Sequence, residues 1–111
     1  MMLTDQEFQQ RSDESLEALY QRLADASEDF DFDVEMNNGA LTVEFEEPRE
    51  RFVVSPNSPV KQIWVSAHVQ SFKFDWKAEE GAGAFVLPES GKTLEQLLVE
   101  AIQKRLPNFA L

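Results

Sequence analysis

The sequence contains no cysteine and a single histidine, His68. Without cysteine, the chain has no disulfide, no thiol nucleophile and no thiolate metal ligand. With one histidine, it cannot form a pair of histidine metal ligands within one chain. Any metal that it binds is therefore held by oxygen ligands. Such ligands suit hard cations such as Ca²⁺, Mg²⁺, Mn²⁺ and iron, and discriminate poorly among them.

Long apolar runs are also missing. No stretch approaches the roughly 20 apolar residues that span a bilayer. The opening MMLTDQEFQQ has neither the charged-then-apolar order of a signal peptide nor the arginine-rich composition of a transit peptide. We therefore expect a cytoplasmic protein that does not bind membranes. The 111 residues, nine of them phenylalanine and two tryptophan, suit a single domain over residues 1–111 with a real hydrophobic core.

Basic residues are scarce, above all in the first half of the chain. The whole chain has 21 acids and 10 bases, and residues 1–50 hold 15 of the acids but 3 of the bases. The first half carries a charge of −12, whereas residues 51–111 carry +1. A negative field repels nucleic acids and anionic membranes, and attracts cations and basic protein surfaces. Solubility explains a negative net charge, but not its concentration in one half.

The spacing of apolar residues predicts a helix, six short strands and a second helix. Thr4 with Glu7, and Thr93 with Gln96, form capping-box patterns that mark the two helix starts. The first helix is expected to run to about Ala26. Strands are expected in residues 27–37, 40–46, 51–55, 60–67, 71–76 and 84–88, and the second helix ends before residue 107.

The short connections between these strands favour an antiparallel meander. Each helix has an apolar stripe that must be buried, so both helices should lie on one face of the sheet. The expected fold is α+β, a two-layer sandwich of a six-stranded antiparallel sheet and two helices. We expect a flexible hairpin within residues 77–85.

The first expected strand carries an acid at every second position. The four acids are Asp29, Asp31, Asp33 and Glu35. On a strand they share one face about 7 Å apart, where each pair repels by roughly 0.6 kcal/mol in water. One explanation is that charges on an edge strand deter pairing with another sheet. The other is that the acids bind a cation or a basic partner through an open, weak site.

Alternation in the segment KQIWVSA sends its isoleucine and valine to the core. Trp64 is therefore turned outward between Gln62 and Ser66, with Lys73 nearby on the next strand. An exposed aromatic residue beside a cation is typical of protein interfaces. Packing over neighbouring side chains on the sheet is the alternative explanation, but that face offers few apolar partners.

Three further patterns do not satisfy their motifs. The segment ESGKT lacks the earlier glycine of a P-loop, and the G-x-G of Gly81 and Gly83 has no third glycine at the required spacing. Acids from Asp33 onward approximate a calcium loop, but Asn38 stands where that loop needs glycine. His68 is expected in a loop between strands.

In order along the chain, an acidic helix is followed by DFDFDVE, NNGALTVEF, KQIWVSA, FKFDW and GKTLEQLL. This series resembles the frataxin family in its shorter bacterial form, over nearly the whole chain. QIW followed by DW is the most specific part of the resemblance, and the acidic surface of helix and strand is the second. The family fold is a six-stranded antiparallel sheet with two helices on one side, as the pattern predicts.

The resemblance implies an iron-binding accessory and regulatory protein of iron–sulfur cluster assembly. Such a protein binds Fe²⁺ and Fe³⁺ weakly without an organic cofactor, and contacts a cysteine desulfurase and a scaffold protein. It has at most slow ferroxidase activity, and is a monomer that iron can drive into oligomers. The alternative is an acidic protein-interaction module with no physiological role for metal.

Two sets of residues carry these implied roles. The metal-binding set, here called the acidic ridge, comprises Glu17, Asp25, Glu28, Asp29, Asp31 and Asp33. The partner-binding set, here called the partner face, comprises Asn57, Gln62, Trp64 and Lys73.

Overall fold

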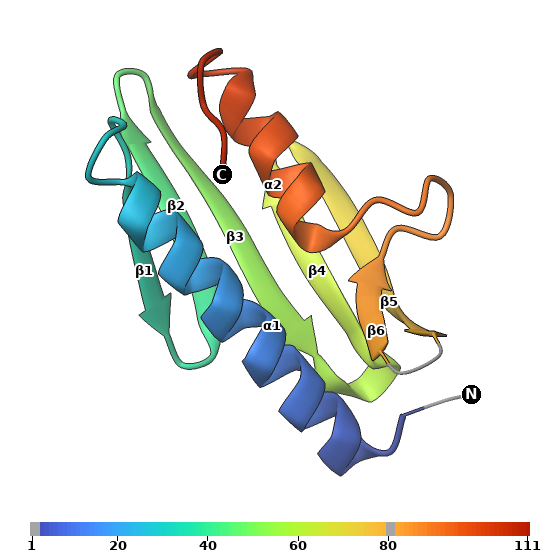
Figure 1. The fold of residues 1–111 in the computed structure, drawn as a ribbon. Helices are drawn as coiled ribbons and strands as arrows, with labels where there is room; N and C mark the ends of the chain where they lie inside the picture. The colour runs from blue at the N-terminus through green and yellow to red at the C-terminus, as the bar shows by residue number, and fades with distance from the viewer. Residues whose placement is uncertain (1–2, 80–81) are drawn as a thin grey trace.

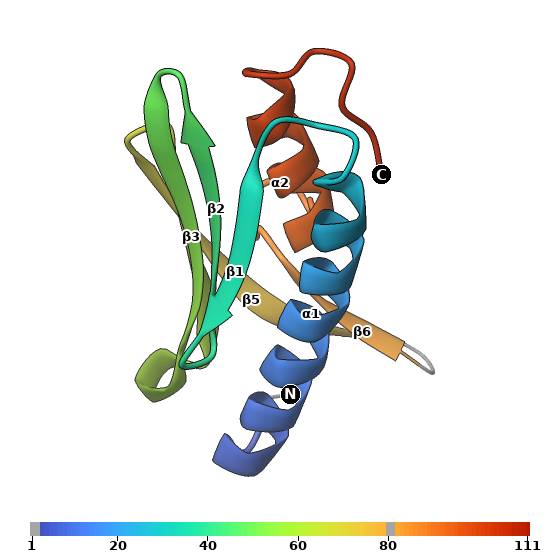
Figure 2. The same ribbon diagram turned by 90° about the vertical axis from the view of Figure 1, so that its left-hand side faces the viewer.

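The computed structural model describes residues 3–79 and 82–111. These residues form a six-stranded antiparallel sheet with both helices on one face, so the predicted α+β sandwich is confirmed (Figures 1 and 2). The strands follow the chain order across the sheet. The elements are α1 (Asp5–Ala26), β1 (Asp33–Asn37), β2 (Ala40–Glu46), β3 (Arg49–Asn57), the 3₁₀ turn η1 (Ser58–Val60), β4 (Gln62–Ala67), β5 (Gln70–Glu79), β6 (Ala82–Val86) and α2 (Leu94–Gln103).

Both helices begin at the predicted capping boxes. The hydroxyl of Thr4 accepts a hydrogen bond from the backbone N–H of Glu7, and the Glu7 carboxylate accepts one from the backbone N–H of Thr4. The pKa of the Glu7 carboxyl lies below its ordinary value, because the backbone N–H of Thr4, and after it the Thr4 side chain, hydrogen-bond to the charged carboxylate. Thr93 and Gln96 make the same pair of bonds at the start of α2.

Among the described residues, no helix has the length and apolar content to cross a membrane.

The core lies between the sheet and the helix layer. Alternate residues of β2 face it, and α1 and α2 each contribute an apolar stripe. The largest fully buried side chains are Phe8, Phe52, Phe74, Phe109, Leu16, Leu23, Leu41, Ile63, Leu98, Ile102, Val43 and Val54. The side of each element that faces the core therefore follows from the apolar pattern.

The prediction that the first strand begins near residue 27 is wrong. Residues 27–32 form a turn and a bend, and β1 begins at Asp33. The end of α1 unwinds through this turn, where the N–H groups of Asp29 and Phe30 both bond to the Ala26 carbonyl. The predicted alternation of exposure survives, because Phe30 and Phe32 still turn inward. Their ring centroids lie 5.1 and 5.7 Å from that of Phe109.

Several other boundaries differ from the prediction. β3 extends past its expected end and includes Pro56, which pairs with Ile63 of β4. Pro56 lies beyond the last residue pair between β2 and β3, so the N–H that proline lacks is not needed for a hydrogen bond to β2. The expected flexible hairpin is largely strand, since Lys77 pairs with Ala84 in β5 and β6. Residues 80 and 81 of that hairpin lie outside the described residues. By contrast, α2 ends at Gln103, before Pro107 as predicted.

The turn between β4 and β5 carries backbone strain. His68 and Val69 have φ values of 52° and 56°, which a two-residue hairpin turn requires at both positions. Val69 is fully exposed, so its β-branched side chain gains no packing in return for this unfavourable conformation.

Val69→Asn is expected to raise the free energy of unfolding by about 1 kcal/mol, because asparagine tolerates the left-handed region. Urea unfolding measures the change. Gln70→Asn, at the exposed next position, serves as the control and should leave stability nearly unchanged. Equal or lower stability of Val69→Asn would show that the strain is absent.

Candidate functional site

The six acids of the ridge come from three consecutive segments of the chain. Glu17 and Asp25 lie on α1, Asp33 opens β1, and the other three lie in the turn between these elements. All six are exposed, so their predicted accessibility agrees with the structure although the backbone between residues 27 and 32 is not a strand. The ridge therefore follows a helix end and a turn rather than one strand face.

The ridge lies at a place where the backbone itself is electronegative. The C-terminal end of α1 carries a partial negative charge, and the last turn of α1 has no basic residue. Within the described residues, none of the six acids takes part in an ion pair. Asp33 stands opposite a further acid, Glu44, whose carboxylate is 2.9 Å from Arg51 Nη2.

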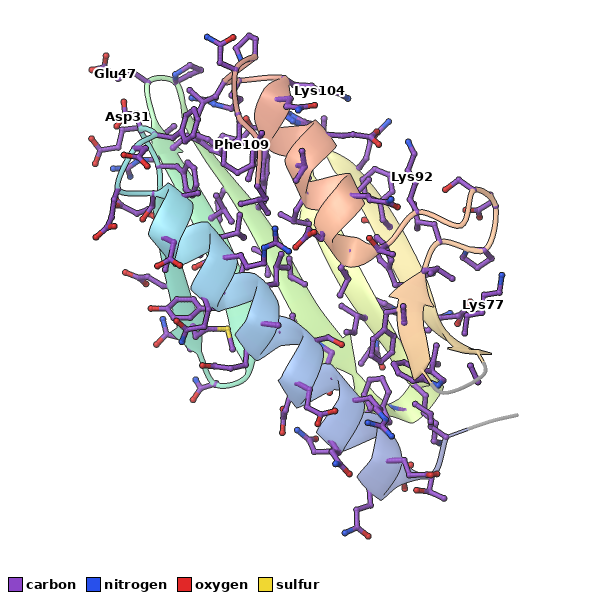
Figure 3. The ribbon with its side chains drawn as sticks, viewed as in Figure 1. Asp31, Glu47, Lys77, Lys92, Lys104 and Phe109 are labelled. Carbon is purple, nitrogen blue, oxygen red and sulfur yellow. The ribbon has the colours of Figure 1, made fainter. Side chains whose placement is uncertain are left out.

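Three lysines lie on the side of the molecule away from Asp31. Figure 3 shows Asp31 and Glu47 at one edge, and Lys77, Lys92 and Lys104 beyond α2 at the other. The uneven charge along the sequence thus becomes an uneven charge in space. A cation or a basic protein surface is attracted to the α1–β1 edge.

The geometry of the acids sets the kind of metal binding that they allow. In the part of the chain that the structure describes, no group of three or more Asp, Glu or His side chains converges on a point that could hold a metal ion. The donors are carboxylate oxygens, which fit hard cations, but they form no chelating cage. They suit an open site where one or two carboxylates and water hold an exchangeable ion.

The partner face is brought together by strand register. Asn57 of β3 pairs with Gln62 of β4, and Trp64 of β4 pairs with Lys73 of β5. The four side chains therefore lie on the sheet surface that faces away from the helices. The predicted outward orientation of Trp64 is correct, because its side chain is 38% exposed while Ile63 is fully buried.

Contacts between side chains hold Trp64 in place. Its indole Nε1–H donates to Gln62 Oε1 at 3.0 Å, and Gln62 Nε2 in turn donates to Asp75 Oδ1 at 3.0 Å. The ammonium group of Lys73 lies 5.0 Å from the centre of the indole ring. Trp64 is therefore an ordered, exposed aromatic side chain with a cation on its ring.

Two neighbours of these surfaces escaped the sequence-based prediction. Asp75 orients Gln62, and Glu44 adds a carboxylate opposite Asp33. Each is the cross-strand partner of a predicted residue, so the register of the sheet was the missing information. That register depends on where β1 and β5 begin.

Comparisons with known proteins agree with this fold. A family model described as a frataxin-like domain matches residues 1–108 of the chain. Among solved structures, a frataxin from Psychromonas ingrahamii, a model for stability modulation within the CyaY protein family, aligns with a TM-score of 0.69. That protein is 25% identical in sequence, and the alignment covers 93% of this chain and 91% of the other.

Proposed function

Because the chain belongs to the frataxin family, we propose that it is a cytoplasmic, iron-binding accessory protein of iron–sulfur cluster assembly. It binds iron weakly at the acidic ridge, and contacts a cysteine desulfurase and a scaffold protein through the partner face. The observation that carries this proposal is the ridge itself. Six exposed acids run from the second half of α1, past its C-terminus, to the start of β1, and none has a counter-ion within the described residues.

Weak binding is what a carrier of iron needs. A cage of converging carboxylates would hold Fe²⁺ or Fe³⁺ too tightly to release it to another protein. Separate carboxylates raise the local concentration of cations without enclosing one of them. Ions bound in this way remain hydrated and exchangeable, and added salt weakens their attraction to the ridge.

Replacing Asp29, Asp31 and Asp33 together with Asn is expected to weaken Fe²⁺ and Co²⁺ binding by about tenfold or more, since three charges leave the ridge. Stability should stay the same or rise, because the change removes repulsion among like charges. Metal titration by calorimetry measures the first effect, and urea unfolding measures the second.

The control removes the same charge elsewhere, through Asp13→Asn, Glu46→Gln and Glu89→Gln, which are all exposed. It should reduce metal affinity much less than the ridge variant does. Equal losses in the two triple variants would mean that net charge, rather than the ridge, attracts the metal. A large loss of stability in the ridge variant would mean that these acids make structural bonds.

A second candidate function is an acidic interaction module that uses no metal. The spread of the acids along a helix end and a turn favours it, since no three of the described acids and histidines converge. An open row of carboxylates also suits a basic protein surface. Binding to the desulfurase–scaffold complex with and without iron separates the two functions, because an interaction module would bind equally well in both conditions.

A further inference from the structure

The ring of His68 joins three elements of the fold. At the turn between β4 and β5, its Nε2 lies 2.8 Å from the carbonyl oxygen of Ala101 on α2. Its Nδ1 lies 3.1 Å from Glu50 Oε2 on β3. The ring also packs edge-on against Phe52, with the centroids 4.8 Å apart. A hairpin turn, a central strand and the last turn of a helix are thus connected through one imidazole.

The carboxylate of Glu50 stands between two basic groups. Its second oxygen, Oε1, accepts a hydrogen bond from Arg105 Nη1 at 3.1 Å. Arg105 is fixed in turn, because Nη2 donates to the Pro48 carbonyl at 2.7 Å and the guanidinium lies 4.5 Å from the centre of the Phe45 ring. Each oxygen of Glu50 therefore serves one partner, and Glu50 remains available to His68.

Both ring nitrogens of His68 face groups that only accept hydrogen bonds. A backbone carbonyl and an ionised carboxylate have no proton to donate, whereas a neutral imidazole has one N–H and one bare nitrogen. Either neutral tautomer therefore points a lone pair at an oxygen, at 2.8 or 3.1 Å. Only the imidazolium, which has two N–H groups, makes both hydrogen bonds.

The Ala101 carbonyl is a suitable partner for a cation. It belongs to the last turn of α2, where carbonyl groups lose their partners within the helix. The N–H groups of Arg105 and Leu106 both bond to Ile102 instead. A positive group at this end of a helix also interacts favourably with the helix dipole.

We propose that His68 is a proton-dependent clasp. In its protonated form it ties the β4–β5 turn to β3 and to the end of α2. When the ring loses its proton, it gives up one of these two bonds, and the turn is held less firmly. The clasp does not depend on the proposed function. The turn that it holds does, however, join β4 and β5, the strands that carry Trp64 and Lys73 of the partner face.

Other charged groups face the ring from the helix side. Lys92, Glu100 and Lys104 line a hollow of about 190 Å³ that His68 also borders, and Lys92 and Lys104 are labelled in Figure 3. Lys92 and Glu100 are paired at 2.8 Å. Glu50 therefore remains the acid in direct contact with His68.

The sign of the pH dependence follows from the protonated form. Both hydrogen bonds are made at acidic pH, where the ring carries two N–H groups. One of them is lost as the pH rises and the ring gives up its proton. Because this chain has one histidine, no other imidazole contributes to the difference between variants.

The test compares unfolding in urea at pH 5.5 and pH 8.5 for wild type and His68→Asn. Asparagine tolerates the positive φ of this position, so the turn itself is preserved. At each pH, the unfolding equilibrium constant of His68→Asn is divided by that of wild type. We expect this ratio to be about tenfold larger at pH 5.5 than at pH 8.5, which is the effect of one charge-assisted hydrogen bond. The same ratio at both pH values would overturn the proposal.

Glu50→Gln provides a second, independent arm. Its amide oxygen can still accept from Arg105, and its NH₂ group can donate to a neutral Nδ1, so the ring no longer needs two protons to satisfy both neighbours. In the Glu50→Gln background, His68→Asn should therefore have the same effect at both pH values. An undiminished pH dependence in that background would mean that Glu50 is not the partner, and would also overturn the clasp.

Discussion

Gly83→Ala is expected to lower the free energy of unfolding by about 3 kcal/mol, although it adds only one methyl group. The indole ring of Trp76 lies directly over Gly83. A Cβ at this position would be 2.8 Å from Trp76 Cε2 and 2.9 Å from Cη2, and it would also clash with Cζ2. Real Cβ atoms essentially never come so close to other atoms, so the ring or the strand must move.

The ring of Trp76 has little freedom to move away. It packs against Phe85 with centroids 5.1 Å apart, and the guanidinium of Arg11 lies 5.7 Å from its centre. Phe85 is itself buried and packs edge-on against Phe8 of α1. A shift of the indole would therefore disturb the contact between α1 and the sheet.

Thermal or urea unfolding of four proteins measures this effect: wild type, the two single variants, and the double variant. Trp76→Leu removes the obstructing ring, so Gly83→Ala should cost little in that background. An equally large loss in both backgrounds would place the cause in the backbone at Gly83 rather than in the contact with Trp76.

Trp64→Ala is expected to weaken binding to a desulfurase–scaffold complex by about 2 kcal/mol or more, roughly thirtyfold, while leaving the fold intact. The side chain is exposed and ordered by Gln62 and Lys73, so its truncation removes a preformed contact and no core packing. Metal affinity should remain that of wild type, since the acidic ridge lies on other elements.

Binding measured at two salt concentrations separates the two surfaces. The loss caused by Trp64→Ala should be nearly independent of salt, whereas loss of ridge acids should slow association in a salt-dependent way. Ser66→Ala, two residues along the same exposed side of β4, is the matched control and should bind as wild type does. If Trp64→Ala binds equally well, Trp64 is not an anchor for this complex.

Local signals in the sequence were sufficient for most of the fold. Both helices start at their capping boxes, because those hydrogen bonds join residues three positions apart. Asn38 and Gly39, a residue pair typical of two-residue hairpin turns, form such a turn with positive φ at both residues. Alternation correctly separated the exposed Trp64 from the buried Ile63.

Features that depend on distant residues were not predictable in the same way. The turn at 27–32 is shaped by the end of α1 and by packing of Phe30 and Phe32 on Phe109, which comes after α2. The partners of His68 come from β3 and α2. Spacing also could not show that the described acids fail to converge, because that depends on how the helix end is turned relative to β1.

The contact between Phe109 and the turn after α1 links early and late parts of protein synthesis. α1 and the acid-bearing turn leave the ribosome before the sheet does, but the ring against which Phe30 and Phe32 pack is made only after the whole sheet and α2. Until then, two aromatic side chains beside the acids lack their partner. The ridge therefore takes its final shape late, and a nascent chain presents the same six carboxylates in a looser arrangement than the finished protein does.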